Sequence, residues 1–74
     1  MSNDELKIRI GRNVQARRKQ LGLNQKQLAA AVGVTPAAMC RVERGQSLPL
    51  LMGDRLAGIL GISFAKLFSE NFQN

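Results

Sequence analysis

The sequence predicts an all-α protein, folded as a compact bundle of five short helices. Three observations support this class. Helix caps and glycine stops alternate along the chain, apolar residues recur at three- and four-residue spacings, and no strand-like alternation is present. Seventy-four residues suffice for one domain with one small core. We therefore expect a single domain over residues 1–74.

The first helix is expected over residues 3–20. Ser2 and Glu5 form a capping-box pattern at its start. Three apolar residues then recur every fourth position, which marks one buried stripe: Leu6, Ile10 and Val14.

The most informative segment runs from Asn24 to Pro36. Asn24 can cap a second helix, with Gln27 completing the capping box, and Gly33 supplies a left-handed stop. Thr35 then caps a third helix that has Pro36 at its first position. The two helices are expected over 25–32 and 36–44. So tight a turn forces them to cross steeply, as in a helix-turn-helix, whose second helix can project into a DNA groove.

The remaining chain predicts two further helices. The fourth is expected over 49–60, with Ser47 as its cap, and the fifth over 64–70. Four residues of the fourth helix are expected to pack inward: Leu50, Leu56, Ala57 and Leu60. Gly53 and Gly58 each weaken a helix by about 1 kcal/mol relative to Ala, so we interpret them as points of close packing.

Charge is unevenly distributed. The chain carries a net charge of +6 and has a pI of about 10.9. Between residues 7 and 44, Glu43 is the one acidic residue, whereas beyond residue 44 the two signs balance. The basic residues of that stretch are Lys7, Arg9, Arg12, Arg17, Arg18, Lys19, Lys26, Arg41 and Arg44. Solvated helix faces can carry such charge, but the asymmetry favours attraction to a polyanion such as nucleic acid.

Catalytic residue types are scarce. The chain has no histidine, no cysteine cluster, no glycine-rich phosphate loop and no close carboxylate pair. We therefore expect no enzyme activity, no cofactor and no metal site. Cys40 is interpreted as a small half-buried filler rather than a redox sensor. Because no apolar run approaches about 18 residues and the N-terminus is polar, we expect no membrane partner and a cytoplasmic location.

A family pattern extends over residues 8–68. It is carried by Arg18, Leu21-Gly22-Leu23-Asn24-Gln25, Leu28-Ala29, Val32-Gly33-Val34-Thr35, Val42-Glu43-Arg44-Gly45, Leu56-Ala57 and Leu60-Gly61-Ile62-Ser63. On these residues the chain resembles the XRE-like family of helix-turn-helix DNA-binding domains, the phage repressor and Cro type. The resemblance implies a lambda-repressor-like bundle whose helix-turn-helix lies at about 25–44, with 36–44 as the recognition helix.

The resemblance also implies a set of DNA-contacting residues: Gln25, Lys26, Pro36, Ala37, Ala38, Arg41 and Arg44. Gln25 corresponds to a phosphate contact that also braces the recognition helix, and Arg44 to a second phosphate contact. Arg41 corresponds to a base-reading position, where guanidinium can pair with guanine. Pro36 and Ala37 depart from many relatives because neither side chain can hydrogen-bond a base edge. We therefore expect specificity to depend on Arg41 and on DNA deformability.

Two further sets of residues have expected structural roles, the first implied by the resemblance and the second by helical spacing. Arg18 and Glu43 are expected to form a largely buried ion pair between the first and third helices. An apolar stripe near the C-terminus is expected to divide between the core and a homodimer interface: Phe64, Leu67, Phe68 and Phe72.

The resulting hypothesis is a sequence-specific transcriptional regulator that binds double-stranded DNA as a homodimer at a near-palindromic operator. The alternative is a protein-interaction module, such as an antitoxin or an adaptor, whose main partner is another protein. RNA binding is a third possibility, weakened by the lack of aromatic residues in the basic half.

Overall fold

The computed structural model describes residues 3–69, which form four α-helices and one 3-10 helix. In chain order these are α1 (Asn3–Gln20), α2 (Gln25–Val32), α3 (Pro36–Glu43), α4 (Gly53–Leu60) and η1 (Phe64–Phe68). The all-α prediction is confirmed, since the described residues contain no strand. The count of five helices needs a correction, because the last element is a short 3-10 helix that ends at Phe68 rather than at residue 70.

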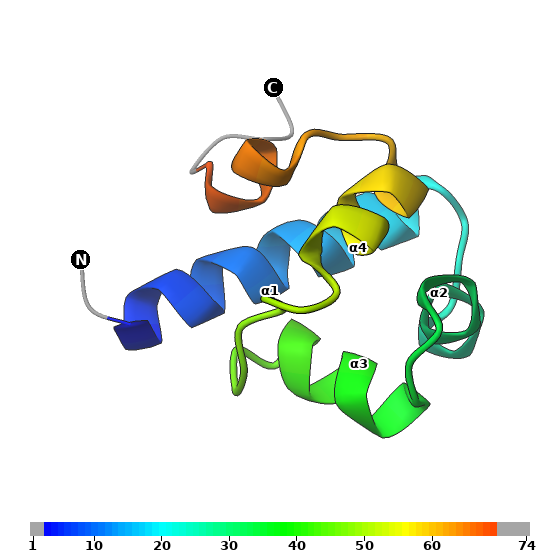
Figure 1. Ribbon diagram of the computed structural model, residues 1–74, viewed down its shortest axis with the longest axis horizontal. Helices are drawn as coiled ribbons and strands as arrows, with labels where there is room; N and C mark the ends of the chain where they lie inside the picture. Colours follow the sequence, from blue (N-terminus) through cyan, green and yellow to red (C-terminus); the bar gives the residue numbers. More distant parts are fainter. Residues whose placement is uncertain (1–2, 70–74) are drawn as a thin grey trace.

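Helix α1 is the longest element, and the others are arranged around it (Figure 1). It packs against α3 on one side and against η1 on the other, while α2 packs against both α3 and α4. None of these helices combines the length and the apolar character needed to cross a membrane. The Ser2 cap predicted for α1 lies outside the described residues.

The ends of α2 and α3 are set by local hydrogen bonds. The Asn24 side chain accepts from the Gln27 N–H at 2.7 Å, and the Gln27 Oε1 accepts from the Asn24 N–H at 2.8 Å, so the predicted capping box is formed. Gly33 ends α2 with a φ of 87°, a left-handed conformation that favours glycine. The Thr35 Oγ1 accepts from the Ala38 N–H at 3.1 Å and starts α3.

The buried core contains no aromatic residue among those that the structure describes. It contains Ile10, Val14, Leu28, Ala29, Val32, Met39, Val42, Leu56, Ala57, Leu60 and Leu67. These residues come from all five elements. The inward face of α3 is therefore fixed by packing, which leaves its opposite face available to solvent.

The predicted start of α4 was wrong. Residues 50–52 form turns, and the helix begins at Gly53 with no side-chain cap, so Ser47 does not cap it. Leu48 packs against the core and Pro49 is buried, so the chain is held at both positions while it passes from α3 to α4. A helix starting at residue 49 is incompatible with that path. As a consequence Leu50, expected to pack inward, is 68% exposed.

The tightest packing at a glycine occurs at Gly53 and Gly11, of which the second was unexpected. A Cβ on Gly53 would lie 2.2 Å from the Phe64 ring, so the interpretation of Gly53 is confirmed. A Cβ on Gly58 would meet nothing within 4 Å, so the interpretation of Gly58 as a point of close packing was wrong. The unexpected position is Gly11 of α1, where a Cβ would lie 2.6 Å from the Val42 carbonyl oxygen. The backbones of α1 and α3 therefore approach each other closely at this glycine.

Candidate nucleic-acid interface

The end of α3 is held by a buried ion pair with α1. The Arg18 Nε donates to the Glu43 Oε2 at 2.7 Å, and the Arg18 Nη2 donates to the Glu43 Oε1 at 3.0 Å. The two side chains are 10% and 2% exposed. The remaining Nη1 group donates to the Leu23 carbonyl oxygen at 2.8 Å. This two-pronged geometry fixes the orientation of α3 against α1.

Gln25 joins the same network from the first turn of α2. Its Nε2 donates to the Glu43 Oε1 at 3.1 Å, and the side chain is half-buried. Gln25 thus contacts α3 at its last residue rather than on its outward face. An amide nitrogen carries two hydrogens, so one remains for another acceptor. Three helices therefore meet at Glu43, and the outer edge of the network is the start of α2.

The outward face of α3 is small and carries one charged side chain. Pro36, Ala37 and Arg41 are exposed, whereas Ala38 and Cys40 are half-buried. Ala37 and Arg41 lie one turn apart and share a face. Arg41 is therefore the charged side chain that α3 presents to solvent, since Glu43 is buried, and its guanidinium is a strong hydrogen-bond donor. Arg44 follows as the C-cap residue and is exposed.

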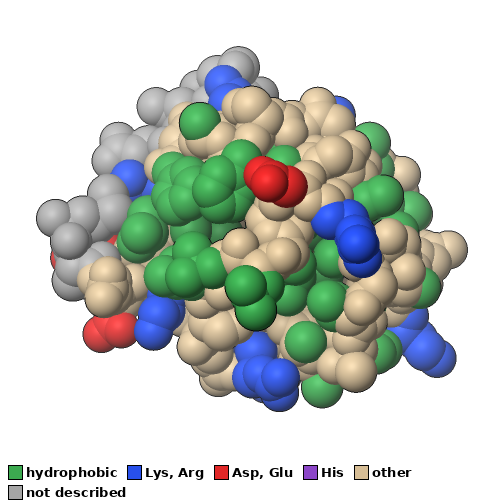
Figure 2. Space-filling view, viewed as in Figure 1, with side chains coloured by type: hydrophobic (Ala, Val, Ile, Leu, Met, Phe, Trp, Pro, Cys, Tyr) green, Lys and Arg blue, Asp and Glu red, His purple; other side chains and the backbone are tan. Residues whose placement is uncertain are grey.

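The exposed charges between residues 7 and 44 are all positive, because the one acidic residue of this stretch, Glu43, is buried with Arg18. The exposed members are Arg12, Lys19, Lys26, Arg41 and Arg44. In Figure 2, Lys and Arg side chains lie along the lower edge of the view, where Figure 1 places α2 and α3. This surface can attract a polyanion.

Not every basic side chain contributes to that surface. The Arg17 Nε donates to the Leu60 carbonyl oxygen at 2.8 Å, at the end of α4. The Arg55 Nη1 donates to the Val32 carbonyl oxygen at 3.0 Å, at the end of α2. Both arginines thus satisfy carbonyl groups at helix C-termini. Counting charges in the sequence therefore overestimates the number available to an external anion.

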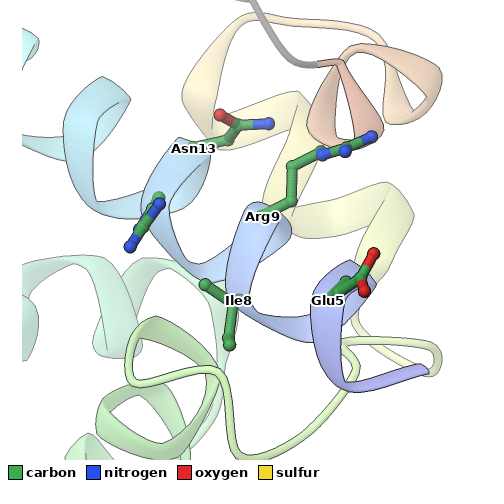
Figure 3. A pocket seen from close by; sticks show the side chains of 5 residues that line it. Glu5, Ile8, Arg9 and Asn13 are labelled. Carbon is green, nitrogen blue, oxygen red and sulfur yellow. The ribbon is translucent and has the colours of Figure 1, made fainter. Parts of the chain in front are cut away.

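A shallow groove of about 380 Å³ lies along α1 (Figure 3), and its polar lining serves to attach the C-terminal segment to this helix. Its lining includes Asn13, whose Nδ2 donates to the Leu67 and Ser69 carbonyl oxygens at 2.7 and 2.8 Å. Figure 3 shows Ile8 pointing away from Asn13 and Arg9. Asn13 therefore ties the C-terminal segment to α1. No group of three metal-ligating side chains occurs within residues 3–69.

The C-terminal apolar stripe is largely used within one molecule. Leu67 is completely buried. The Phe64 and Phe68 rings are half-buried, with centroids 5.2 Å apart and planes at 84°. Phe72 lies outside the described residues. Dimerisation through Phe64 and Phe68 stays a prediction, whereas Leu67 has no surface to offer.

Two exposed leucines were missed by sequence reasoning. Leu50 is 68% exposed and Leu51 is fully exposed, both in the loop between α3 and α4. One available signal was the uncharged stretch 45–53 around Pro49, which has no charged residue to form a polar helix face. The prediction of a helix from residue 49 did not take this lack of charged residues into account.

Two short helices joined by a tight glycine turn, the second with one face buried and one exposed, define a helix-turn-helix protein. The chain belongs to the HTH_3 helix-turn-helix family, of XRE type, whose family model matches residues 14–67. This membership makes it a protein of a DNA-binding transcriptional-regulator family.

Two relatives agree with this assignment. The chain is 41% identical over 49 residues to an uncharacterized HTH-type transcriptional regulator of Methanothermobacter thermautotrophicus, which covers 65% of this chain and 71% of that protein. It also resembles the crystal structure of an HTH_3 family transcriptional regulator from Vibrio cholerae, with a TM-score of 0.83 and 29% identity. That match covers 97% of this chain but 41% of the solved chain, so this chain spans about two fifths of that relative.

Proposed function

We propose that this chain is a sequence-specific transcriptional regulator that binds a near-palindromic DNA operator as a homodimer, with α3 in the major groove. The observation that carries the proposal is the division of α3 into two faces. One face is held by the core and by the Arg18–Glu43–Gln25 network, and the other presents Arg41. A rigid helix with one outward guanidinium is suited to reading a base edge.

Base reading in this proposal depends on few side chains. Arg41 pairs with the O6 and N7 atoms of a guanine. Ala37 can only pack against a thymine methyl group, and Pro36 has no hydrogen-bonding side-chain group. Each half-site therefore contains few directly read base pairs. The remaining selectivity comes from how easily the operator deforms to fit the protein.

Phosphate contacts in this proposal come from residues on both sides of α3. Gln25 directs its second amide hydrogen to a phosphate at the start of α2, where the helix dipole also favours negative charge. Lys26 and Arg44 are exposed and supply positive charge on either side. Because Glu43 holds the Gln25 amide, this contact is oriented before DNA arrives. Such phosphate contacts set the register of α3 on the duplex.

The alternative function is a protein-interaction module, and one observation favours it. Leu50 and Leu51 form an exposed apolar surface that DNA phosphates do not require. On this alternative the chain binds another protein tightly and duplex DNA weakly. Selection of bound duplexes from a random-sequence pool distinguishes the two functions, because a protein-interaction module is expected to enrich no DNA sequence.

Selection of bound duplexes from a random pool tests the proposed function. Wild-type protein is expected to enrich two inverted half-sites about one helical turn, roughly 34 Å, apart. Arg41→Ala is expected to reduce preference at one base pair of each half-site by about 10- to 100-fold. Arg41→Lys retains the charge but loses the bidentate contact, so it should lose preference while keeping general affinity.

Two results would contradict the proposal. One is a wild-type pool with no enriched sequence at moderate salt. The other is an Arg41→Ala pool with an unchanged motif, which removes Arg41 as the base-reading residue and leaves general DNA binding intact.

A further inference from the structure

We propose that Leu50 and Leu51, with the groove beside them, form a two-fold contact surface for a second copy of this chain. We name these residues and the groove the leucine surface. The inference rests on the proposed function, because it supplies the dimer contact that a near-palindromic operator needs. It places that contact in the loop after α3 rather than on the C-terminal phenylalanines.

The protruding part of the leucine surface is the leucine pair. Scattered exposed leucines are normal, but here two consecutive leucines are both exposed, one by 68% and one fully. They lie within the stretch 45–53, which contains no charged residue. Figure 2 shows the largest gathering of hydrophobic side chains on the upper left of this face, where Figure 1 places η1 and α1, with smaller groups below it toward the loop between α3 and α4.

The receiving part is an open groove of about 580 Å³. Its lining is mainly apolar, with one acidic and one basic residue: Val32, Gly33, Val34, Leu51, Met52, Asp54 and Arg55. Leu51 belongs to this lining, and Leu50 precedes it in the chain. A protruding leucine and an apolar groove are therefore adjacent on the same molecule. This is the self-complementary arrangement that a two-fold contact requires, since each copy inserts Leu50 and receives the other's.

Charge favours a second copy at this place. Each copy carries a net charge of +6, so two copies repel unless they meet where charge is absent or paired. The leucine surface offers both conditions: an uncharged loop, then Asp54 and Arg55 in the first turn of α4. The contact between the Arg55 Nη1 and the Val32 carbonyl oxygen holds Arg55 at the groove. A two-fold axis can therefore bring Asp54 of each copy to Arg55 of the other.

The position of the leucine surface also fits DNA geometry. The loop follows α3 directly, so a contact made there controls the distance and the angle between two copies of α3. The molecule measures 31 × 25 × 18 Å. In a two-fold dimer, equivalent points are separated by twice their distance from the axis, so α3 of each copy must lie about 17 Å from the axis to match half-sites roughly 34 Å apart. A distance of that size fits within one molecule, so a two-fold axis at the leucine surface is compatible with the half-site spacing.

Sedimentation equilibrium of the 74-residue chain tests this inference. The wild type is expected to dimerise, and Leu50→Gln combined with Leu51→Gln is expected to raise the dimer dissociation constant at least about 100-fold. Each substitution removes two buried leucines from a two-fold interface. Asp54→Arg, an independent variant, should weaken the dimer through repulsion by the second copy's Arg55. The control is Leu21→Gln, which changes a leucine that is 41% exposed elsewhere.

A DNA measurement separates failure of this inference from failure of the proposed function. The double variant is expected to bind a duplex with one half-site as the wild type does, but to lose cooperative binding to two half-sites. A wild-type chain that stays monomeric, alone and on DNA, overturns the inference, as does a double variant that dimerises like Leu21→Gln. If the wild type enriches no DNA sequence, the proposed function fails instead, whatever the leucine variants do in sedimentation.

Discussion

At the scale of single residues, Glu43 connects the three helices that form the DNA-binding unit. Its carboxylate accepts two hydrogen bonds from Arg18 of α1 and one from Gln25 of α2. Glu43 itself is the last residue of α3. The carboxylate is almost fully buried. A buried pair of this kind adds little net stability, but it leaves an uncompensated charge when one partner is removed.

We predict that Glu43→Gln lowers the free energy of unfolding by about 3 kcal/mol, because the buried Arg18 guanidinium loses its countercharge. Urea denaturation measures this change. DNA affinity should also fall, because α3 and the Gln25 amide lose a common anchor.

The control is a double variant, Arg18→Met with Glu43→Leu. It removes both charges, so stability should recover to near the wild-type value. DNA binding should stay weak, because Glu43→Leu leaves no side-chain acceptor for the Gln25 amide. If Glu43→Gln melts like the wild type, the ion pair has no structural role.

At the scale of elements, the crossing of α1 and α3 depends on a residue with no side chain. Gly11 faces the Val42 and Glu43 carbonyl oxygens, which would lie 2.6 and 2.7 Å from an added Cβ. These neighbours are backbone atoms at the end of α3, so they cannot yield as a side chain does. The close approach also brings Arg18 of the same helix within reach of Glu43.

We predict that Gly11→Ala destabilises the protein by about 1–3 kcal/mol, because the two helices must separate to accommodate a methyl group. Thermal unfolding measures the change. Gly58→Ala is the matched control: it is also a helical glycine, but it is exposed with open space around it. That control should raise stability by up to about 1 kcal/mol through helix propensity. Equal effects at both positions would refute the steric explanation.

At the scale of the whole molecule, folding determines which charged side chains remain exposed to solvent. The acidic residue of the basic half is buried, and two arginines bind helix ends. What remains outside is a set of exposed cations that includes Lys26 and Arg44, next to α2 and α3. DNA affinity should therefore fall steeply as salt rises, because bound protein displaces condensed counterions.

We predict that Arg44→Ala lowers the slope of log affinity against log salt concentration by about 1 for each bound subunit, because one phosphate contact is lost. Its sequence preference should match the wild type, in contrast to Arg41→Ala. Fluorescence anisotropy over a salt series measures the slope. Lys66→Ala, which removes a cation from η1, serves as the control and should leave the slope unchanged. A wild-type slope for Arg44→Ala would exclude Arg44 from the phosphate contacts.

The sequence by itself determined the helix-turn-helix and its family. Asn24, Gly33 and Thr35 act through bonds to residues at most four positions away, so the ends of α2 and the start of α3 could be located without tertiary contacts. The same holds for the exposed position of Arg41, which follows from helical periodicity around buried Met39 and Val42.

Only the tertiary structure decided where α4 begins, which arginines bind helix ends, and which apolar residues stay outside. The Arg17–Leu60 and Arg55–Val32 contacts join residues 43 and 23 positions apart, and no local pattern encodes them. Likewise, Leu50 resembles a core residue in sequence. In the structure Leu48 and Pro49 lie inward and α4 begins only at Gly53, so Leu50 stays in the exposed loop. Capping is a short-range interaction and can be read from neighbouring residues, whereas burial depends on which distant surfaces meet.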